Sequence, residues 1–481
     1  MSDAIVAWEL QPALRLFNTL GNSESHFAPA DGEAVRIYLC GPTVYSSPHI
    51  GNMRSYIFGD LLRRTLRFAG YQVVSAMNIT DVGHLTSDAD QGDDKMAKAA
   101  AAEHVTAWQI AEKYTAMFFD FAAQLNITPT DFVLRATDHL KEQIALIQRL
   151  DEAGVVYRTD DGMYFDTSRT PDYGKLTPND DRESLLAGER VAIGGKRNVT
   201  DFALWKFSDP AGPKRDMEWD SPWGVGFPGW HIECSAMAMA YLGETLDIHV
   251  GGIDHIAIHH TNEIVQSETV TGKPFSRWWM HGAFLIAEGE RRMGKSEGNH
   301  ITVANLRDLG YHPLEFRYLT ELSHYRSPLT FSMPVLDSAA TAYRRLRNLV
   351  GQLRDEAAGQ EPEPGWADSP YRHQFVAALA DDINIPRAIA VVWKLIRSAD
   401  PTPATRFALI ELFDQVLGLD LASPMDQEII PEQIKELAER RWQLRADRRF
   451  GDADLVRDQL AALGYTIRDS RTGYEVIRLD V

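Results

Sequence analysis

The chain has 481 residues, of which 44% are hydrophobic and 24% charged, a composition typical of globular proteins and unlike collagenous or disordered chains. Two cysteines exclude a disulfide framework, and the sequence has no uncharged apolar run of about 18 residues, so we expect no membrane contact. The acidic start, MSDAIVAWELQPALRLF, does not resemble a secretory signal, and we expect a cytoplasmic protein. The net charge of −19 argues against binding duplex nucleic acid with the whole surface.

The first regular elements follow a βαβ pattern. VRIYLCGPTV at 35–44 predicts a short buried strand, PHIGNMRSYIFGDLLRRTLRFAG at 48–70 a helix closed by Gly70, and YQVVSAMNIT at 71–80 a second strand. This order predicts an α/β fold with a parallel sheet, whose ligands bind beyond the carboxyl ends of the strands. Residues 40–52 therefore occupy a favoured ligand position.

The rest of the chain divides into segments of different pattern. Residues 99–156 predict amphipathic helices, and residues 157–227, rich in Asp, Gly, Pro and Thr, predict a connecting insertion between two halves of the sheet. TLDIHVGGI at 245–253 predicts a buried strand that returns to the sheet. From about 332 the pattern is helical, and from about 424 two helices precede a terminal hairpin in GYTIRDSRTGYEVIRLD. We therefore expect domains at 1–331, 332–423 and 424–481.

One basic segment lies in the last domain, at 435–449. Its arginines at helix spacing are Arg440, Arg441, Arg445, Arg448 and Arg449. They suit either a face that binds phosphates or a solvated helix face.

A short motif opens the first predicted helix. Pro48-His49-Ile50-Gly51-Asn52 lies where free N–H groups and the helix dipole attract phosphate oxygens. Gly51 lets a nucleotide approach the backbone, and His49 and Asn52, three residues apart, can face one bound phosphate. Taken alone, the motif also suits an ordinary helix start.

A second motif, Arg292-Met293-Gly294-Lys295-Ser296-Glu297-Gly298-Asn299, is a Gly-rich loop whose cations could hold a polyphosphate. Alone it is an ordinary basic turn. Together, HIGN after the first strand and RMGKS late in the chain resemble the HIGH and KMSKS signatures of class I aminoacyl-tRNA synthetases. The resemblance implies a Rossmann-like parallel-sheet catalytic domain with a connecting insertion, followed by a helical bundle and a small C-terminal α+β module.

Further segments resemble the cysteinyl-tRNA synthetase family over nearly the whole chain. They are CGPTVY, NITD, WKF, SPWG, GWHIECSAM, GGID and HHTNE. The resemblance implies ATP-dependent activation of L-cysteine, with Mg²⁺ on the phosphates, and transfer to tRNA(Cys) by a monomer. It also implies that the helical and terminal domains read the tRNA.

The resemblance implies one zinc ion per chain, held by Cys40, Cys234, His259 and Glu263. The chemistry agrees, because thiolates and imidazole are good zinc ligands and His259 and Glu263, at i and i+4, share one helix face. In this family the substrate sulfur joins the metal, so a thiolate is selected over the hydroxyl of serine without editing. From the residues alone, both cysteines could instead be small buried core residues.

The resemblance also implies other site residues. Catalytic roles fall to His49, Asn52, Arg292 and Lys295. Contacts with ATP fall to Gly41, His49, Gly51, Asn52, Gly251, Gly252, Asp254, Lys295 and Ser296. Contacts with cysteine fall to Cys40, Thr80 and Trp230. Considered singly, Trp230 suits a core aromatic, Thr80 a strand-end cap and Asp254 a turn former; His231 is expected to pack or to orient its neighbours.

Both signatures depart from the family pattern. Asn52 stands where the family has histidine, and Arg292 and Gly294 stand where it usually has lysine and serine. Asparagine still donates hydrogen bonds and arginine keeps the charge, so phosphate binding is expected to persist without the titratable imidazole. Two alternatives stay open: a cysteine ligase acting on a small amino-sugar acceptor, and an inactive, zinc-stabilised RNA-binding paralogue.

Overall fold

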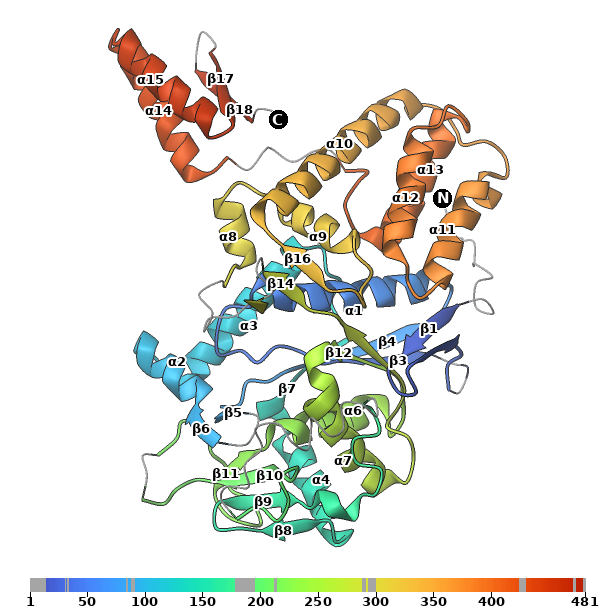
Figure 1. Ribbon diagram of the computed structural model, residues 1–481, viewed down its shortest axis with the longest axis vertical. Helices are drawn as coiled ribbons and strands as arrows, with labels where there is room; N and C mark the ends of the chain where they lie inside the picture. Colours follow the sequence, from blue (N-terminus) through green and yellow to red (C-terminus); the bar gives the residue numbers. More distant parts are fainter. Residues whose placement is uncertain are drawn as a thin grey trace.

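The computed structural model describes residues 14–30, 32, 34–83, 85–87, 91–177, 195–211, 214–287, 291–292, 300–423, 430–469 and 473–478. At its centre lies a five-stranded parallel sheet in the order β13-β12-β3-β4-β7 (Figure 1). Its strands are β3 (Val35–Leu39), β4 (Val73–Ile79), β7 (Phe132–Arg135), β12 (Leu246–Gly252) and β13 (Ser276–Gly282). The predicted α/β fold with a parallel sheet is confirmed.

Helices cover both faces of this sheet, so its central strands β3, β4 and β12 are almost continuously buried. The helix α1 (Ile50–Phe68) crosses from β3 to β4 and packs with Ile37 and Leu39 in one hydrophobic cluster. On the opposite face, α6 (Trp230–Leu242) packs against Tyr38, and α7 (Thr261–Thr271) lies beside α6 (Figure 1). Alternate residues of β3 thus face different helices, as the pleat requires.

The long connection from β4 to β12 carries the insertion. Its helices and strands are β5 (Leu85–Ser87), β6 (Gln91–Asp94), α2 (Lys95–Glu103), α3 (Ala107–Gln124), α4 (Leu140–Glu152), β8 (Val156–Arg158), β9 (Gly162–Phe165), β10 (Phe202–Phe207) and β11 (Gly226–Pro228), with 3₁₀ turns η1 (Ala136–His139) and η2 (Thr167–Arg169). The strands β8 to β11 form an antiparallel sheet in the order β11-β10-β9-β8. The segment expected to be helical, 99–156, also contains the strand β7, which was not predicted from the sequence: FVLR pairs in parallel with β4 and extends the central sheet.

The helical part follows the sheet and packs on α1. It contains α8 (Val303–Asp308), α9 (Pro313–Glu321), β16 (Leu329–Phe331), α10 (Met333–Ala357), η6 (Trp366–Asp368), α11 (Pro370–Ala380), α12 (Ile385–Ile396) and α13 (Pro403–Leu417). Figure 1 shows this part above α1, and α9 and α13 contact α1 directly.

A buried arginine cluster joins the two parts. Arg317 of α9 pairs with Asp60 of α1 at 2.9 Å and with Glu321, one turn further along α9, at 2.9 Å. It also donates to the carbonyls of Leu125 and Leu417, each at 2.9 Å. One guanidinium therefore ties together α1, the end of α3, α9 and the end of α13.

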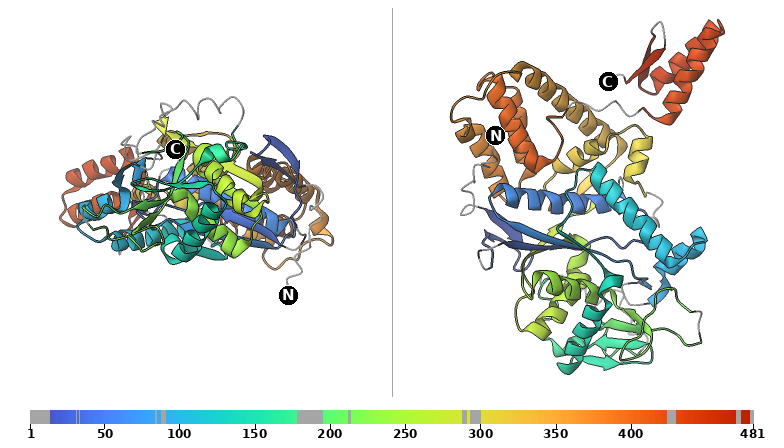
Figure 2. Two further views of the ribbon diagram at one scale, coloured as in Figure 1. Left: turned by 90° about the horizontal axis from the view of Figure 1, so that it is seen from below. Right: turned by 180° about the vertical axis from the view of Figure 1, so that it is seen from behind.

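The C-terminal lobe projects from one end of the molecule in Figure 1 and in the right-hand view of Figure 2, and its Tyr465 lies close to Gly310, just after α8. It contains α14 (Glu432–Ala446), α15 (Phe450–Ala462), β17 (Tyr465–Asp469) and β18 (Tyr474–Arg478). The two strands pair antiparallel, which confirms the predicted hairpin. The predicted basic face is partly internal, because Arg441 is buried and Arg441 and Arg445 both pair with Asp469.

Short strands complete the described structure. They are β1 (Arg15–Asn18), β2 (Ser23–His26), β14 (Leu285–Ala287) and β15 (Arg291–Arg292). Among the described helices, none has both the length and the apolar character needed to cross a membrane.

Candidate functional site

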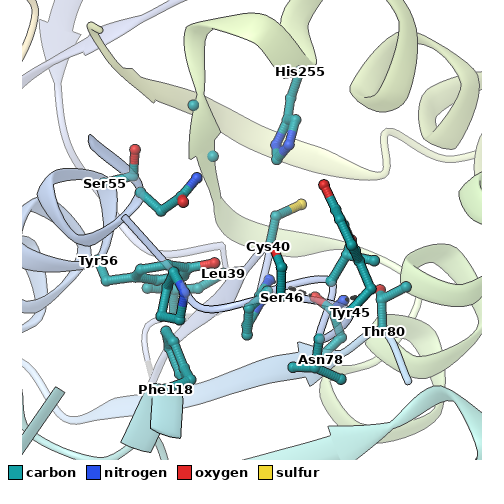
Figure 3. Close-up of a pocket in the computed structure, with 18 of the residues that line it drawn as sticks. Leu39, Cys40, Tyr45, Ser46, Ser55, Tyr56, Asn78, Thr80, Phe118 and His255 are labelled. Carbon is teal, nitrogen blue, oxygen red and sulfur yellow. Dashed lines mark hydrogen bonds between the residues drawn. The ribbon is translucent and has the colours of Figure 1, made fainter. Parts of the chain in front are cut away.

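A cavity of about 580 Å³ opens at the carboxyl ends of β3, β4 and β12, where an α/β sheet is expected to bind ligands. Cys40 follows β3, Asn78 and Thr80 lie at the end of β4, and His255 faces them across the cavity (Figure 3). The predicted site residues that line the cavity are Cys40, Gly41, His49, Asn52, Thr80, Trp230, Cys234, Gly251, Gly252, Asp254 and His259. Segments far apart in sequence therefore meet at one hollow.

The first signature forms the start of α1. The Asn52 N–H donates to His49 Nδ1 at 3.2 Å, and the His49 N–H donates to Asn52 Oδ1 at 3.1 Å. His49 and Asn52 thus bond to each other in a capping box, a feature that the sequence reasoning missed. The arrangement leaves His49 Nε2 and the Asn52 amide nitrogen as donors at the cavity wall.

The His49 imidazole is neutral at pH 7. Burial, and then the neighbouring His300 ring, lower the pKa of His49 to about 4. Because Nδ1 accepts the Asn52 N–H, the ring proton lies on Nε2. His49 can therefore donate to a phosphate oxygen without carrying a positive charge.

Of the second signature, the structure describes only Arg292. Arg292 lies in β15, where its backbone pairs with Ile286 of β14. Two residues beyond the signature, the Ile301 carbonyl accepts from the Ile50 N–H at the start of α1 at 2.8 Å. Lys295 and Ser296 lie outside the described residues, so their predicted roles stay predictions.

Two predicted ATP-contact glycines stand where a side chain has no room. A Cβ at Gly41 would lie 1.6 Å from the Asn78 carbonyl oxygen, and one at Gly251 would lie 2.6 Å from ring atoms of His255 and His260. Close packing of the chain against itself therefore requires glycine at both positions.

A cluster of side chains that could ligate a metal borders the cavity: Cys40, Cys234 and His259 line it, and Glu263 lies next to them. The ligand atoms of Cys40, Cys234, His259 and Glu263 all lie within 4.8 Å of one another, and all four residues are buried. His259 Nε2 is 3.0 Å from Glu263 Oε1, as the i, i+4 spacing predicts. The residues are thus compatible with a bound metal cation, because thiolates, imidazole and carboxylate all offer electron pairs toward one point.

Sequence reasoning missed a second set that shares two of these residues. Cys40, His249, His260 and Glu263 also place their ligand atoms within 4.8 Å of one another. His249 Nε2 lies 2.9 Å from Glu263 Oε2, and His260 Nε2 lies 3.2 Å from Cys40 Sγ. Adjacent histidines in HHTNE, and a histidine inside the strand TLDIHVGG, are the signals that could have found this set.

The buried groups of the cluster shift one another's pKa values. Burial alone would raise the pKa of Glu263, but His249 and His259 lower it to about 2. Burial would lower the pKa of His259, but Glu263, followed by Cys234, raises it to about 10. A metal cation that takes these electron pairs must displace such protons.

A change of helix type positions the cluster. After β12 the chain makes a 3₁₀ turn, η3 (Ile253–His255), and then a π-helical turn, η4 (Ile256–His260), before α7 begins. This π turn carries His259, which belongs to the first ligand set, and His260, which belongs to the second. Turns of this kind are frequent at functional sites.

A chain of directed hydrogen bonds lies beside the cluster. The Gly41 N–H donates to Asn78 Oδ1 at 2.7 Å, and Asn78 Nδ2 donates to Thr80 Oγ1 at 3.0 Å. The Thr80 hydroxyl then donates to Glu233 Oε2 at 2.9 Å. Glu233 is fully buried in the first turn of α6 and was not predicted from the sequence.

Two further residues singled out from the sequence, Trp230 and His231, both contact His259. Trp230 packs its ring 4.4 Å from that of His259, between centroids, so it contacts the cluster as well as the cavity. His231 Nδ1 lies 3.0 Å from His259 Nδ1, as expected for a residue that orients its neighbour.

Comparisons with known proteins agree with this geometry. Residues 26–341 match the family described as tRNA synthetases class I (C) catalytic domain. A cysteine–tRNA ligase 1 of Burkholderia lata is 49% identical over 462 residues, covering 96% of each chain, and a cysteine–tRNA ligase of Novosphingobium aromaticivorans is 42% identical over 473 residues, covering 95% of each. The solved methionyl-tRNA synthetase of Mycobacterium tuberculosis with methionyl-adenylate is similar in fold, with a TM-score of 0.54, 16% identity, and coverage of 80% of this chain and 90% of that one.

The doubly wound sheet and the matched domain define a class I aminoacyl-tRNA synthetase, an enzyme that uses ATP. With relatives of this identity over almost the full length, the chain belongs to the cysteine–tRNA ligase family. The family resemblance read from the motifs is confirmed.

Proposed function

We propose that the chain activates L-cysteine with ATP and transfers the cysteinyl group to tRNA(Cys), acting as a monomer in the cytoplasm. The observation that carries the proposal is the convergence of Cys40, Cys234, His259 and Glu263 beside the cavity that also holds His49 and Asn52. A thiol-recognising cluster and a phosphate-binding helix start thus share one hollow.

Zinc is the proposed resident metal, with Cys40, Cys234, His259 and Glu263 as its ligands. Two thiolates and one imidazole favour zinc over the hard cations Ca²⁺ and Mg²⁺, which prefer oxygen. When bound, zinc supplies a Lewis acid that favours a thiolate over a hydroxyl group. Cys40, Thr80 and Trp230 complete the proposed cysteine pocket.

The proposed first step joins cysteine to AMP. The cysteine carboxylate attacks the α-phosphorus of ATP, and pyrophosphate leaves. In this proposal, His49 and Asn52 donate hydrogen bonds to phosphate oxygens. The charge that develops on the phosphates is balanced by Arg292, Lys295 and Mg²⁺. Holding the two substrates in the reactive orientation supplies the remaining rate acceleration. The proposed ATP contacts are Gly41, His49, Gly51, Asn52, Gly251, Gly252, Asp254, Lys295 and Ser296.

In the proposed second step, a hydroxyl of the terminal adenosine of the tRNA attacks the adenylate carbonyl, and AMP leaves. We assign catalysis to residues 1–331, with the insertion at about 99–227, and tRNA binding to 332–423 and 424–481. Support comes from the separate C-terminal lobe, since a lobe beyond the helical part can reach a distant part of a long RNA.

The test is ATP–pyrophosphate exchange with L-cysteine and with L-serine, combined with metal analysis of the same sample. We expect stoichiometric zinc and a preference for cysteine of at least about 10⁴-fold, as in sites built around a required polar group. Exchange absent with every amino acid would favour the inactive paralogue. Exchange followed by transfer to an amino sugar instead of tRNA would favour the small-molecule ligase.

A further inference from the structure

Glu233 is buried, lies next to a proposed metal ligand in sequence, and has no part in the chemistry described so far. It is 0% exposed and does not line the cavity, so it cannot contact a substrate there. Its Oε2 accepts the Thr80 hydroxyl at 2.9 Å. Through this contact, Thr80 relays an effect of Glu233 to the cavity.

The direction of each hydrogen bond in this chain is fixed by the one before it. The Gly41 N–H is a backbone donor, so the Asn78 atom facing it at 2.7 Å must be the amide oxygen. The Asn78 amide nitrogen therefore faces Thr80 Oγ1 and donates to it at 3.0 Å. The only proton of the Thr80 hydroxyl then goes to Glu233.

This leaves Thr80 with a defined polarity toward the cavity. A hydroxyl oxygen has two lone pairs and one proton. One lone pair accepts from Asn78 and the proton goes to Glu233, so the remaining lone pair is available at the cavity that Thr80 lines. Thr80 can therefore accept a hydrogen bond from a ligand and cannot donate one.

We infer that Glu233 is a positioning residue for the α-ammonium group of the amino-acid substrate: by holding the Thr80 proton, it fixes Thr80 Oγ1 as an acceptor for that group. The inference rests on the proposed function, because it requires an amino acid in this cavity. Without the Glu233 acceptor, the Thr80 proton is free to turn toward the cavity, where it opposes a cationic donor. An ammonium group then loses a charge-assisted hydrogen bond.

The test compares two ligands of the intact protein that differ only in the amino group. L-cysteine carries it, and 3-mercaptopropionate keeps the thiol and the carboxylate without it. Binding of each is measured by titration calorimetry under a non-thiol reductant, for the wild type, Glu233→Met, Glu233→Gln and Thr80→Val. Glu321→Met is the matched control, since Glu321 is also buried but lies outside the cavity lining.

We expect Glu233→Met to weaken the binding of L-cysteine about tenfold or more, the size expected for loss of a hydrogen bond to a charged group. The affinity for 3-mercaptopropionate should stay within about twofold of the wild-type value. Glu233→Gln keeps an oxygen acceptor and should restore most of the cysteine affinity. Thr80→Val combined with Glu233→Met should lose no more than Thr80→Val alone, because both act on one interaction. Glu321→Met should change neither ligand.

Other results overturn the inference. Equal weakening of both ligands, or loss of metal from Glu233→Met, would make Glu233 a structural residue. If Glu233→Met changed the affinity for neither ligand, Glu233 would have no role in binding. If Glu233→Gln weakened cysteine binding as much as Glu233→Met does, the effect would come from the charge of Glu233 and not from the orientation of the Thr80 proton. A wild type that binds neither ligand would instead contradict the proposed function, so the two failures are distinguishable.

Discussion

Two buried clusters of charged residues lie on opposite sides of the central sheet, and they differ in where their positive charge comes from. In the arginine cluster, the guanidinium of Arg317 is part of the chain and meets Asp60, Glu321 and main-chain carbonyls. In the metal cluster, defined as Cys40, Cys234, His259 and Glu263, every ligand atom offers an electron pair.

The comparison teaches how to separate buried charge that holds a fold together from buried charge that binds something. Arg317 is always protonated, and its planar fork matches fixed carboxylate and carbonyl partners. The metal cluster draws on thiols and imidazoles, whose protons a metal can displace, and it borders a cavity of about 580 Å³. The arginine cluster is complete as the chain folds, whereas the proposed metal would supply the cation of the metal cluster from solution.

The largest expected effect comes from removing a proposed ligand. Cys234→Ser replaces a thiolate by a much poorer zinc ligand, and we expect metal affinity to fall at least about 100-fold, beyond the range usual for residues that only support a ligand. Cysteine-dependent exchange should fall with it. Competition with a chelator measures the metal affinity; wild-type affinity in the variant would place the metal elsewhere.

The complementary change breaks the arginine cluster. Arg317→Met leaves the Asp60 carboxylate buried without its main cation and removes the hydrogen-bond donor of Glu321, and we expect the free energy of unfolding to fall by about 3–5 kcal/mol. Zinc content per folded chain should stay at the wild-type value. Urea unfolding with metal analysis checks both; a stable variant that has lost zinc would show that the two clusters are not independent.

The pH dependence of the free energy of unfolding should reveal the protonation of Glu321 in the arginine cluster. Burial raises the pKa of Glu321 to about 8, although Arg317 opposes the shift. The folded chain therefore holds a proton that the unfolded chain releases above its ordinary pKa of about 4.3. This contribution to stability is fully present below that value and is lost as the pH rises through about 8.

We accordingly expect Glu321→Gln, which has no proton to lose, to flatten the fall in unfolding free energy between pH 5 and 8 by an amount on the order of a few kcal/mol. Urea unfolding at several pH values measures the slope. The matched control is the exposed Glu363→Gln, which should leave the slope unchanged. A variant slope equal to that of the wild type would mean that Glu321 is ionised in the folded chain.

The smallest effect should come from a third charged group, at the edge of the C-terminal lobe. Arg441 meets both oxygens of Asp469, at 2.8 and 2.9 Å, but Asp469 stays partly exposed. Water screens such a pair, so Arg441→Gln should cost about 1 kcal/mol or less. Thermal melting, monitored with a probe in the lobe, measures this loss of stability. A loss as large as that of Arg317→Met would contradict the distinction between fully buried and partly exposed ion pairs.

The parts of the fold that sequence predicts are those with local patterns. The strand at 35–39, α1 and the terminal hairpin follow from apolar spacing and turn residues within a few positions. The strand β7 was missed because its four residues, FVLR, are mostly exposed and lie between two helices, so only pairing with β4 defines them. For Arg317, only the i, i+4 pair with Glu321 is visible in the sequence, since its other partners come from α1 and from the ends of α3 and α13.

The site divides in the same way. Cys40 and Cys234 meet only through the sheet, and their link was available solely from the family resemblance. The hydrogen bonds of Asn52 to His49 follow from spacing that the sequence displays, and a capping box could have been predicted there. The histidines of the second ligand set are visible in the sequence, but that they meet Cys40 and Glu263, and that Glu233 meets Thr80, depends on distances between folded elements.

The π-helical turn at Ile256–His260 sets a limit on how this region can evolve. An α-helix advances about 100° per residue, so deleting one residue between β12 and α7 would turn Glu263 away from Cys40 and Cys234, which belong to other elements. Substitutions at exposed positions such as Ile253 leave that angle intact. In this stretch the number of residues is under stricter constraint than the identity of most of them, and insertions or deletions here should be far rarer among functional homologues than point changes.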